Sequence, residues 1–289
     1  MRRKQILTSL IDRNGIGLEV GPSHDPVAPK ADGYRVEVVD HLSQDALRDK
    51  YRGHGVELDR IEPVDHIWRG GPLEEVSGIG RDYDWIIASH VIEHLPNPVG
   101  FMKSCQRLLR AGGMLSLAIP DKRYCLDYLR PPSSTGDVLQ AHLDGRTRHL
   151  PGQVFDSFSF ASTRAGSMSW ERDAGGAIDF LHGHGFGGLM LENYLADPGY
   201  VDIHGWVFTP SSFRLIISDL NALGYLDIDE AGFTPTVGCE FFVTFINASS
   251  AGLQDRMSLA LRARAEAFDD PVTTPIGRLR SLLRAWRGH

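Results

Sequence analysis

The segment ASHVIEHLPNP contains three side chains that could bind a metal ion, because His90, Glu93 and His94 follow the spacing H-x-x-E-H. This is the inverted zinc-protease signature. Such a site needs both histidines on one continuous helix and a further ligand from elsewhere. Two prolines follow the motif at once and leave room for at most one helical turn. We therefore expect no metal site at this motif: His90 should face a ligand, while Glu93 and His94 support the turn through hydrogen bonds.

A second group of chemically useful residues lies where predicted strands end. Gly21 lets a ligand approach the backbone, and Glu19 beside it can accept a hydrogen bond or form an ion pair. Asp40 closes the next strand, where a carboxylate can accept both hydroxyl protons of a ribose; otherwise it is a solvated turn residue. The turn lacks G-x-G-x-x-G, since Pro22 follows Gly21, which argues against a pyrophosphate and so against NAD or FAD. A cofactor with a ribose and no phosphates fits better.

Alternating strands and helices must position these residues. Strands are predicted at GIGLEVG, YRVEVVD, RIEPVDHIW, YDWIIASH, MLSLAIP, YLDIDEAGF and CEFFVTFINA. Helices are predicted at the N-terminus, at LSQDALRDKY, at NPVGFMKSCQRLLRAGG with a stop at Gly112-Gly113, and at TPSSFRLIISDLNALG with Thr209 as its cap. This alternation predicts an α/β fold around a mostly parallel sheet. Ligands bind such sheets beyond the carboxyl ends of the strands.

The chain is expected to divide into a core domain, residues 1–250, and a tail, residues 251–289. Residues 131–205 are rich in glycine, serine, histidine and aromatic residues, so we expect them to form a helical and loop insertion that covers the substrate. The tail ends in IGRLRSLLRAWRGH, a basic amphipathic sequence. It can lie on an anionic membrane surface, contact a protein partner, or pack on the domain with solvated arginines.

Four stretches together resemble one known family, the class I S-adenosylmethionine-dependent methyltransferases. They are LEVG, the strand that ends at Asp40, YDWIIASHVIEHLPNP and LLRAGGMLSLAIPD. The resemblance covers residues 15–125 together with the late helix and strand pair. Its most specific part is the run D-x-I-x-x-x-x-V-I-E-H followed by GG-x-L-x-L-x-x-P. The stretch AIPDKRYCLDYLRP looks like a bacterial subgroup associated with sugar or cell-surface polysaccharide pathways.

The resemblance implies a Rossmann-like, seven-stranded sheet whose last strand is antiparallel, with S-adenosylmethionine as the cofactor. The residues that it implies for cofactor binding lie at strand ends: Glu19, Gly21 and Pro22 near the methionine part, Asp40 at the ribose, Trp68 and Arg69 near the adenine, and Ser89 and His90 along the floor. The usual second glycine of the first turn is replaced by Pro22-Ser23.

Transfer of a methyl group to a hydroxyl requires alignment of the acceptor and removal of its proton, often by a histidine. Candidate bases lie in the glycine-rich second half: His204 first, then His182, His184 and His149. Clustered histidines there can equally form a metal site or be hydrogen-bonded loop residues.

Candidate acceptor-binding residues are polar or aromatic and follow the MLSLAIP strand or lie near the end of the insertion: Asp121, Arg123, Tyr124, Arg130 and Trp206. Their alternatives are structural. Asp121 can be a helix cap, and the others can be packing residues or surface charge.

Composition narrows the classes of function. The net charge of −7 argues against a nucleic-acid partner, and so against RNA methylation. Three widely spaced cysteines form no disulfide framework, so a cytoplasmic location is expected, with contact at the inner face of a membrane as an option for the tail. The hypothesis is methyl transfer from S-adenosylmethionine to a hydroxyl of a small molecule or glycan. The alternative is a non-catalytic subunit of a glycan-assembly complex that binds the cofactor.

Overall fold

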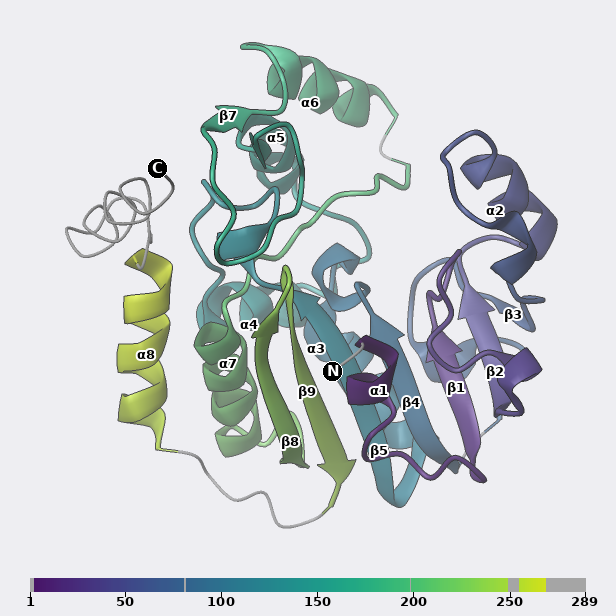
Figure 1. The fold of residues 1–289 in the computed structure, drawn as a ribbon. Coiled ribbons are helices and arrows are strands. Elements are labelled where there is room, and N and C mark those ends of the chain that lie inside the picture. Colours follow the sequence, from purple (N-terminus) through teal and green to yellow (C-terminus); the bar gives the residue numbers. More distant parts are fainter. Residues whose placement is uncertain (1–2, 81, 198, 249–254, 269–289) are drawn as a thin grey trace, which may run out of the picture.

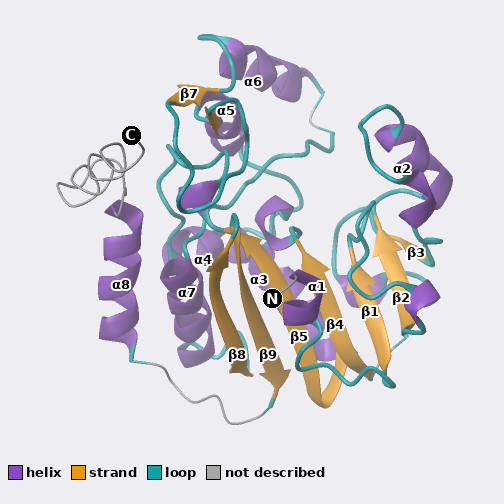
Figure 2. Ribbon diagram, viewed as in Figure 1, coloured by secondary structure: helices purple, strands orange, loops and turns teal. Residues whose placement is uncertain are grey.

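A seven-stranded sheet forms the centre of the computed structural model, which describes residues 3–80, 82–197, 199–248 and 255–268 (Figures 1 and 2). Its strand order is β3-β2-β1-β4-β5-β9-β8. The strands are β1 (Ile16–Val20), β2 (Arg35–Asp40), β3 (His66–Ile67), β4 (Tyr83–Ser89), β5 (Leu109–Pro120), β8 (Ile228–Val237) and β9 (Glu240–Asn247). The strand β9 runs antiparallel to both of its neighbours, β5 and β8. The predicted α/β sheet with an antiparallel last strand is confirmed.

Burial on both faces explains why the central strands are almost continuously apolar. Along β4, Trp85 and Ile87 face one side of the sheet, whereas Ile86 and Ala88 belong to the core on the other side. The Trp85 ring lies directly over Gly17 of β1, where an added Cβ would meet it at 2.1 Å. Gly17 is therefore required by the packing of the strand pair and not by a turn.

Helices cover the sheet unequally. The face that carries Ile86 is covered by α3 (Pro98–Leu108), α4 (Thr135–Leu143) and α7 (Pro210–Ala222), and the other face by α1 (Arg3–Leu7) and the loop before β2 (Figure 1). The helix α2 (Gln44–Tyr51) lies beyond the carboxyl ends of β2 and β3 (Figure 1). Thr209 caps α7 by accepting from the Ser212 amide, as predicted.

The predicted helix stop at Gly112-Gly113 is wrong. Helix α3 ends at Leu108, and both glycines lie within β5. Gly112 has a φ of +75°. The pairing of β4 with β5 is irregular at this place, between Tyr83 and Trp85. The glycines therefore allow a distortion at the start of a strand, where the chain turns directly from helix to sheet.

The residues between β5 and α7 contain α4, α5 (Pro151–Ser159), β6 (Ser162–Arg164), β7 (Ile178–Phe180) and α6 (Phe186–Ala196). Helix α4 belongs to the main core, through Val138 and Ala141. The elements α5 and α6 lie beyond the carboxyl ends of the strands and share a small core of their own with Ile203 (Figure 1). The insertion thus lies over the edge of the sheet where ligands bind in such folds.

The tail begins with α8 (Arg256–Phe268), which packs along α7. Leu259 is fully buried there, and Glu266 accepts hydrogen bonds from the amide and hydroxyl of Ser211. The basic segment 276–289, on which the membrane prediction rests, lies outside the described residues. Among the described residues, no helix has the length and apolarity needed to cross a membrane.

Candidate functional site

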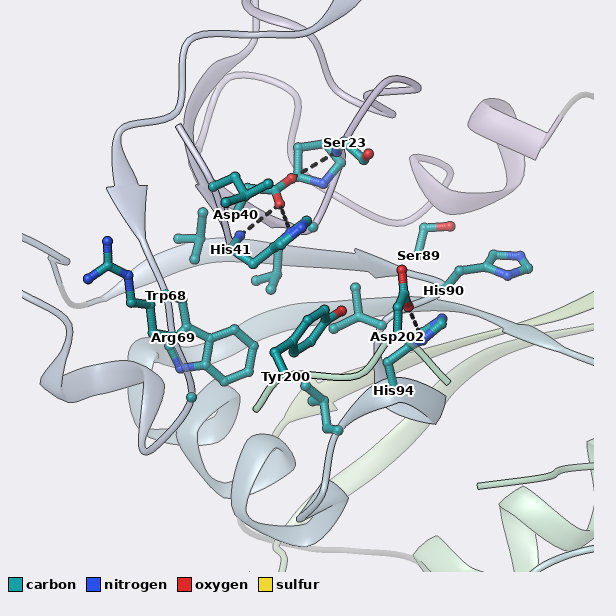
Figure 3. Close-up of a pocket in the computed structure, with 18 of the residues that line it drawn as sticks. Ser23, Asp40, His41, Trp68, Arg69, Ser89, His90, His94, Tyr200 and Asp202 are labelled. Carbon is teal, nitrogen blue, oxygen red and sulfur yellow. Dashed lines mark hydrogen bonds and ion pairs between the residues drawn. The ribbon is translucent and has the colours of Figure 1, made fainter. Parts of the chain in front are cut away.

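A cavity of about 1120 Å³ opens at the carboxyl ends of β1, β2 and β4 (Figure 3). All eight predicted cofactor-binding residues line it: Glu19, Gly21, Pro22, Asp40, Trp68, Arg69, Ser89 and His90. The sheet brings them together because its central strands are parallel and end at the same edge. This cavity is the candidate active site.

The turn after β1 depends on Gly21. Its φ is +65°, a conformation that other residues rarely adopt, and its amide donates to Val39 O at 2.7 Å. An added Cβ would lie 2.9 Å from Val91 Cγ2. Beyond it, Ser23 Oγ and His24 Nδ1 are buried without a hydrogen-bond partner among the described residues. This turn therefore offers a ligand open backbone and two unused polar atoms.

Asp40 ends β2 with a buried carboxylate that faces the cavity (Figure 3). Its Oδ2 accepts from the Ser23 amide at 3.0 Å, and its Oδ1 accepts from the His41 amide at 2.7 Å. The His41 ring lies 2.6 Å from the same Oδ1. Two carboxylate oxygens have about four acceptor positions, so these contacts orient Asp40 and leave it able to accept from a ligand hydroxyl.

Glu19 braces the same loop from inside. Its carboxylate is 2% exposed and accepts hydrogen bonds from the backbone amides of Val27 and Ala28, the latter at 3.1 Å. Burial raises the pKa of Glu19 to about 7 and outweighs these two hydrogen bonds, which lower it. Glu19 thus shapes the cavity wall as well as lining it.

The folded protein should lose stability as the pH rises through the range in which Glu19 ionises. The pKa of Glu19 is about 7 in the folded state against an ordinary value of 4.5, so the stabilising protonated form is complete below pH 4.5 and lost near pH 7. The loss should amount to at most about 3 kcal/mol. Urea unfolding of the wild type and of Glu19→Gln at several pH values between 4.5 and 8 measures it. Parallel curves for the two proteins would contradict the assignment.

Trp68 and Arg69 form the wall beyond β3 (Figure 3). The Trp68 ring stacks on Phe101 with centroids 6.0 Å apart, and its Nε1 donates to Gly71 O. Arg69 is exposed at the cavity rim. The pair provides a flat aromatic surface beside a cation, which suits a planar ring such as adenine.

Ser89 and His90 form the floor, and the N-terminal helix reaches them. Arg3 donates to Ser89 Oγ and to Glu240, and it pairs with Asp25 at 3.1 Å. His90 has a positive φ of +53°, and its Nε2 lies 2.7 Å from Glu240 Oε2. Sequence reasoning missed Arg3, because nothing in its neighbourhood connects it to the end of β4.

The H-x-x-E-H motif forms a single 3-10 turn, Ile92–His94, as predicted. The expectation that the Glu93 and His94 side chains support this turn by hydrogen bonds is wrong, since no side-chain hydrogen bond of either is found among the described residues. Glu93 is 1% exposed, and neither carboxylate oxygen has a hydrogen-bond partner among the described residues. His94 lines the cavity, and its ring lies edge-to-face against His204 at 4.7 Å. Glu93 and His94 of the motif therefore lie close to His204, which stands 110 positions after His94 in the chain.

His204, the first candidate base, lies behind His94 and does not itself line the cavity. Its Nδ1 is 2.5 Å from Asp127 Oδ2, and Arg130 pairs with Asp127 Oδ1 at 2.6 Å. Burial opposes charge on Asp127, but His204 and Arg130 outweigh it and hold the pKa of Asp127 at about 2. Burial also opposes charge on His204, but the Asp127 carboxylate raises the pKa of His204.

The other candidate bases differ in position. His149 lines the cavity, and its Nε2 bonds to His94 O at 3.0 Å. Burial lowers the pKa of His149 to about 4, so its ring is neutral at pH 7. His182 stacks on Phe186 and His184 is exposed, both in the loop before α6 and away from the cavity wall. Their placement gives no support to a catalytic role for either.

None of the predicted acceptor-binding residues lines the cavity. Asp121 caps the 3-10 turn Lys122–Tyr124, which is the structural role that the sequence offered as the alternative to acceptor binding. It also pairs with Arg123 at 2.6 Å. Tyr124 is buried. Arg130 donates to His204 O as well as to Asp127, and Trp206 Nε1 donates to Leu95 O at 2.5 Å. Arg130 and Trp206 thus tie segments that lie far apart in the chain, and none of the five residues lines the cavity.

Two cavity residues that sequence reasoning missed follow α6. Tyr200 stacks on His41 with ring centroids 5.7 Å apart, and Asp202 Oδ1 lies 3.0 Å from His94 Nδ1 (Figure 3). Lys50 of α2 pairs with Asp202 at 3.6 Å. No sequence motif includes Tyr200 or Asp202. The one signal in the sequence is that a tyrosine and an acidic residue stand close to His204 in the chain. The segment spans the cavity from the insertion to the first strands.

Comparison with known proteins is consistent with this geometry. The sequence model of a family described as a methyltransferase domain matches residues 2–194. A ubiquinone biosynthesis O-methyltransferase from Parvibaculum lavamentivorans is 35% identical over 51 residues, which are 18% of this chain and 20% of that relative. The chain therefore aligns with only about a fifth of the length of this curated relative.

Solved structures match over most of the chain at low identity. A SAM-dependent methyltransferase from Aquifex aeolicus is 14% identical, with a TM-score of 0.41, over 85% of this chain and 90% of that one. A putative zinc-dependent alcohol dehydrogenase from Rhodobacter sphaeroides is 12% identical, with a TM-score of 0.45, over 86% and 90%. Because both identities and both TM-scores are low, neither structure supports a conclusion about the reaction of this chain.

Proposed function

Because this chain belongs to the methyltransferase domain family, we propose that it transfers a methyl group to a hydroxyl of a small molecule or glycan. The cofactor that goes with this family assignment is S-adenosylmethionine. The short match to an O-methyltransferase supports oxygen as the acceptor atom. The sugar and polysaccharide context rests on the resemblance of the AIPDKRYCLDYLRP stretch alone.

The residues present fit this cofactor. The positive φ of Gly21 leaves backbone for close approach, and the unused Ser23 Oγ and His24 Nδ1 can serve the polar methionine end. Asp40 would hold the ribose hydroxyls, and Trp68 would lie beside the adenine. When bound, S-adenosylmethionine supplies an electrophilic methyl group on a sulfonium.

The observation that carries the proposal is that one cavity joins two chemically different ends. Gly21, Asp40, His94, His149 and Asp202 all line it, and Figure 3 shows Asp40 on one side of the space and His94 and Asp202 on another. Its volume of about 1120 Å³ exceeds the roughly 300–1,000 Å³ of a pocket for one drug-sized molecule. There is room for a nucleoside cofactor and an acceptor together.

This chain would then align the acceptor with the methyl group, exclude water and take up the proton that the acceptor hydroxyl loses. Tyr200 and Asp202 reach across the cavity and close it toward α2. Transfer to a hydroxyl releases that proton at the His94 end, where His94 and His149 face the cavity. Glu93 and His204 lie directly behind His94.

The test combines binding and turnover. Calorimetric titration of S-adenosylmethionine should show micromolar binding, and S-adenosylhomocysteine should form when phenolic or sugar hydroxyl acceptors are added. Mass spectrometry should place the added methyl on oxygen. Binding with no product from any acceptor would favour the non-catalytic subunit, and absence of binding by the folded protein would overturn the proposal.

A further inference from the structure

Three side chains of metal-binding type converge behind the inner end of the cavity. Glu93 and His94 come from the turn after β4, and His204 comes from the segment before α7. Their ligand atoms all lie within 4.8 Å of one another. We propose that Glu93, His94 and His204 bind one divalent transition-metal ion, best matched by zinc, which receives the acceptor hydroxyl. The role toward the acceptor rests on the proposed function, whereas the binding of the ion does not.

Glu93 is the first reason to place a cation here. Its carboxylate is 1% exposed and makes no hydrogen bond to any described residue. Burial of a polar group without a hydrogen bond is unfavourable, and a buried charge needs a partner. Two imidazole nitrogens lie within ion-pair distance of Glu93 Oε1: His90 Nδ1 at 3.4 Å and His94 Nε2 at 3.7 Å. A cation between Glu93 and the histidines would satisfy the carboxylate.

The orientation of the two imidazole rings is the second reason. Asp127 holds His204 Nδ1 at 2.5 Å, and Asp202 lies 3.0 Å from His94 Nδ1. Asp127 therefore occupies Nδ1 of His204 through a hydrogen bond and leaves its Nε2 for a ligand, which is how a carboxylate orients a metal-binding histidine. Asp202 stands beside His94 Nδ1 as an ion-pair partner without a hydrogen bond. His94 Nε2 and Glu93 Oε1 are 3.7 Å apart, close to the roughly 3.4 Å edge of a tetrahedron with bonds of about 2.1 Å.

The donor set decides the class of ion. Two imidazoles and one carboxylate suit zinc and neighbouring transition metals, whereas magnesium and calcium prefer oxygen ligands. Three protein ligands leave a coordination position open, and His94 is the ligand that lines the cavity. A hydroxyl bound there would lose its proton to water more readily. Its oxygen would then form the new C–O bond while the C–S bond breaks with its electron pair left on sulfur.

Sequence analysis expected no metal at this motif, because a zinc-protease site needs a continuous helix. In the structure, three candidate ligands come together without a continuous helix. The third ligand, His204, is delivered by tertiary folding, and only Glu93 and His94 of the motif take part. His90 instead bonds through Nε2 to Glu240. The competing occupant of the cluster is a proton, which would turn the histidines into simple ion-pair partners of Glu93.

The test is metal titration of the full-length protein after treatment with EDTA, followed by calorimetry with zinc chloride and by visible absorption with cobalt chloride. The wild type should bind one equivalent with micromolar or tighter affinity. Glu93→Gln, which keeps the size of the side chain, and His94→Ala should weaken binding by about 100-fold or more. Asp202→Asn should weaken it by about 10-fold. His184→Ala, in an exposed loop, is the matched control and should bind as the wild type does.

Two results would overturn the site. One is a folded wild type that binds no stoichiometric zinc or cobalt, and the other is equal affinity in the wild type, Glu93→Gln and His94→Ala. Titration of S-adenosylmethionine into the metal-free protein separates this inference from the proposed function. Retained cofactor binding without metal binding would remove the metal site alone, whereas metal binding without cofactor binding would remove the proposed function alone.

Discussion

Replacing Asp127 by alanine is expected to lower the free energy of unfolding by about 3–5 kcal/mol, because it breaks a buried ion pair and leaves its partners uncompensated. The Asp127 carboxylate is 2% exposed and binds Arg130 and His204, from two segments of the chain that it joins. Without it, Arg130 keeps only the His204 carbonyl as an acceptor among the described contacts, and His204 Nδ1 loses its partner. Urea unfolding at pH 7 measures the change.

The control for this effect is Asp144→Ala, which removes the acid of a surface pair with Arg146 at 2.8 Å. Exposed pairs contribute little, so this variant should unfold with the wild type. Asp127→Asn keeps the volume and one acceptor oxygen and should fall between the two. A midpoint for Asp127→Ala that matches that of Asp144→Ala would show that the buried pair does not stabilise the folded chain by joining the segments of Arg130 and His204.

The second large effect is expected on cofactor affinity. Asp40→Ala should raise the Kd for S-adenosylmethionine by about 100-fold, since hydrogen bonds to a charged group contribute about 1.5–3 kcal/mol each and 2.7 kcal/mol is a factor of 100. The carboxylate is already oriented by the amides of Ser23 and His41. Calorimetric titration of both S-adenosylmethionine and S-adenosylhomocysteine measures the loss, and both ligands should weaken together because they share the ribose.

Asp40 also stabilises its own loop, so a loss of affinity must be separated from a loss of folding. Asp40→Asn keeps a neutral acceptor and should weaken binding by about 10-fold. Asp45→Ala, exposed on α2, is the matched control and should bind as the wild type does. Thermal unfolding of each variant without ligand reports on the loop itself. An unchanged Kd in both Asp40 variants would exclude the ribose role.

Local signals in the sequence predicted the elements, and they failed where distant segments meet. Thr209 and the proline after it predict the start of α7, and Asp40 marks the end of β2, because capping and strand ends are set by neighbouring residues. Gly112-Gly113 misled because a glycine pair suits both a helix stop and an irregular strand, and the pairing of β4 with β5 decides between them.

The residues of the candidate site also fall into those that the sequence could predict and those that it could not. Residues at the ends of parallel strands could be predicted, since the fold class alone brings those ends together. The acceptor-side candidates Asp121, Arg123 and Arg130 misled because a charge in the sequence does not show its partner, and all three pair with a residue no more than three positions away. The proximity of Glu93 to His204 could not be predicted, because it depends on how the whole insertion folds.

The insertion has a consequence for how this enzyme could change its substrate. Asp127, His149, Tyr200, Asp202 and His204 all belong to one uninterrupted stretch between β5 and α7, whereas Gly21 and Asp40 lie before β4. Under the proposed function, an exchange of that stretch with a relative would replace most of the residues proposed for the acceptor, leave Glu93 and His94 in place, and spare Gly21 and Asp40. The stack of Tyr200 on His41, the neighbour of Asp40, is the one described ring contact that crosses between the two ends, so a working chimera must preserve it.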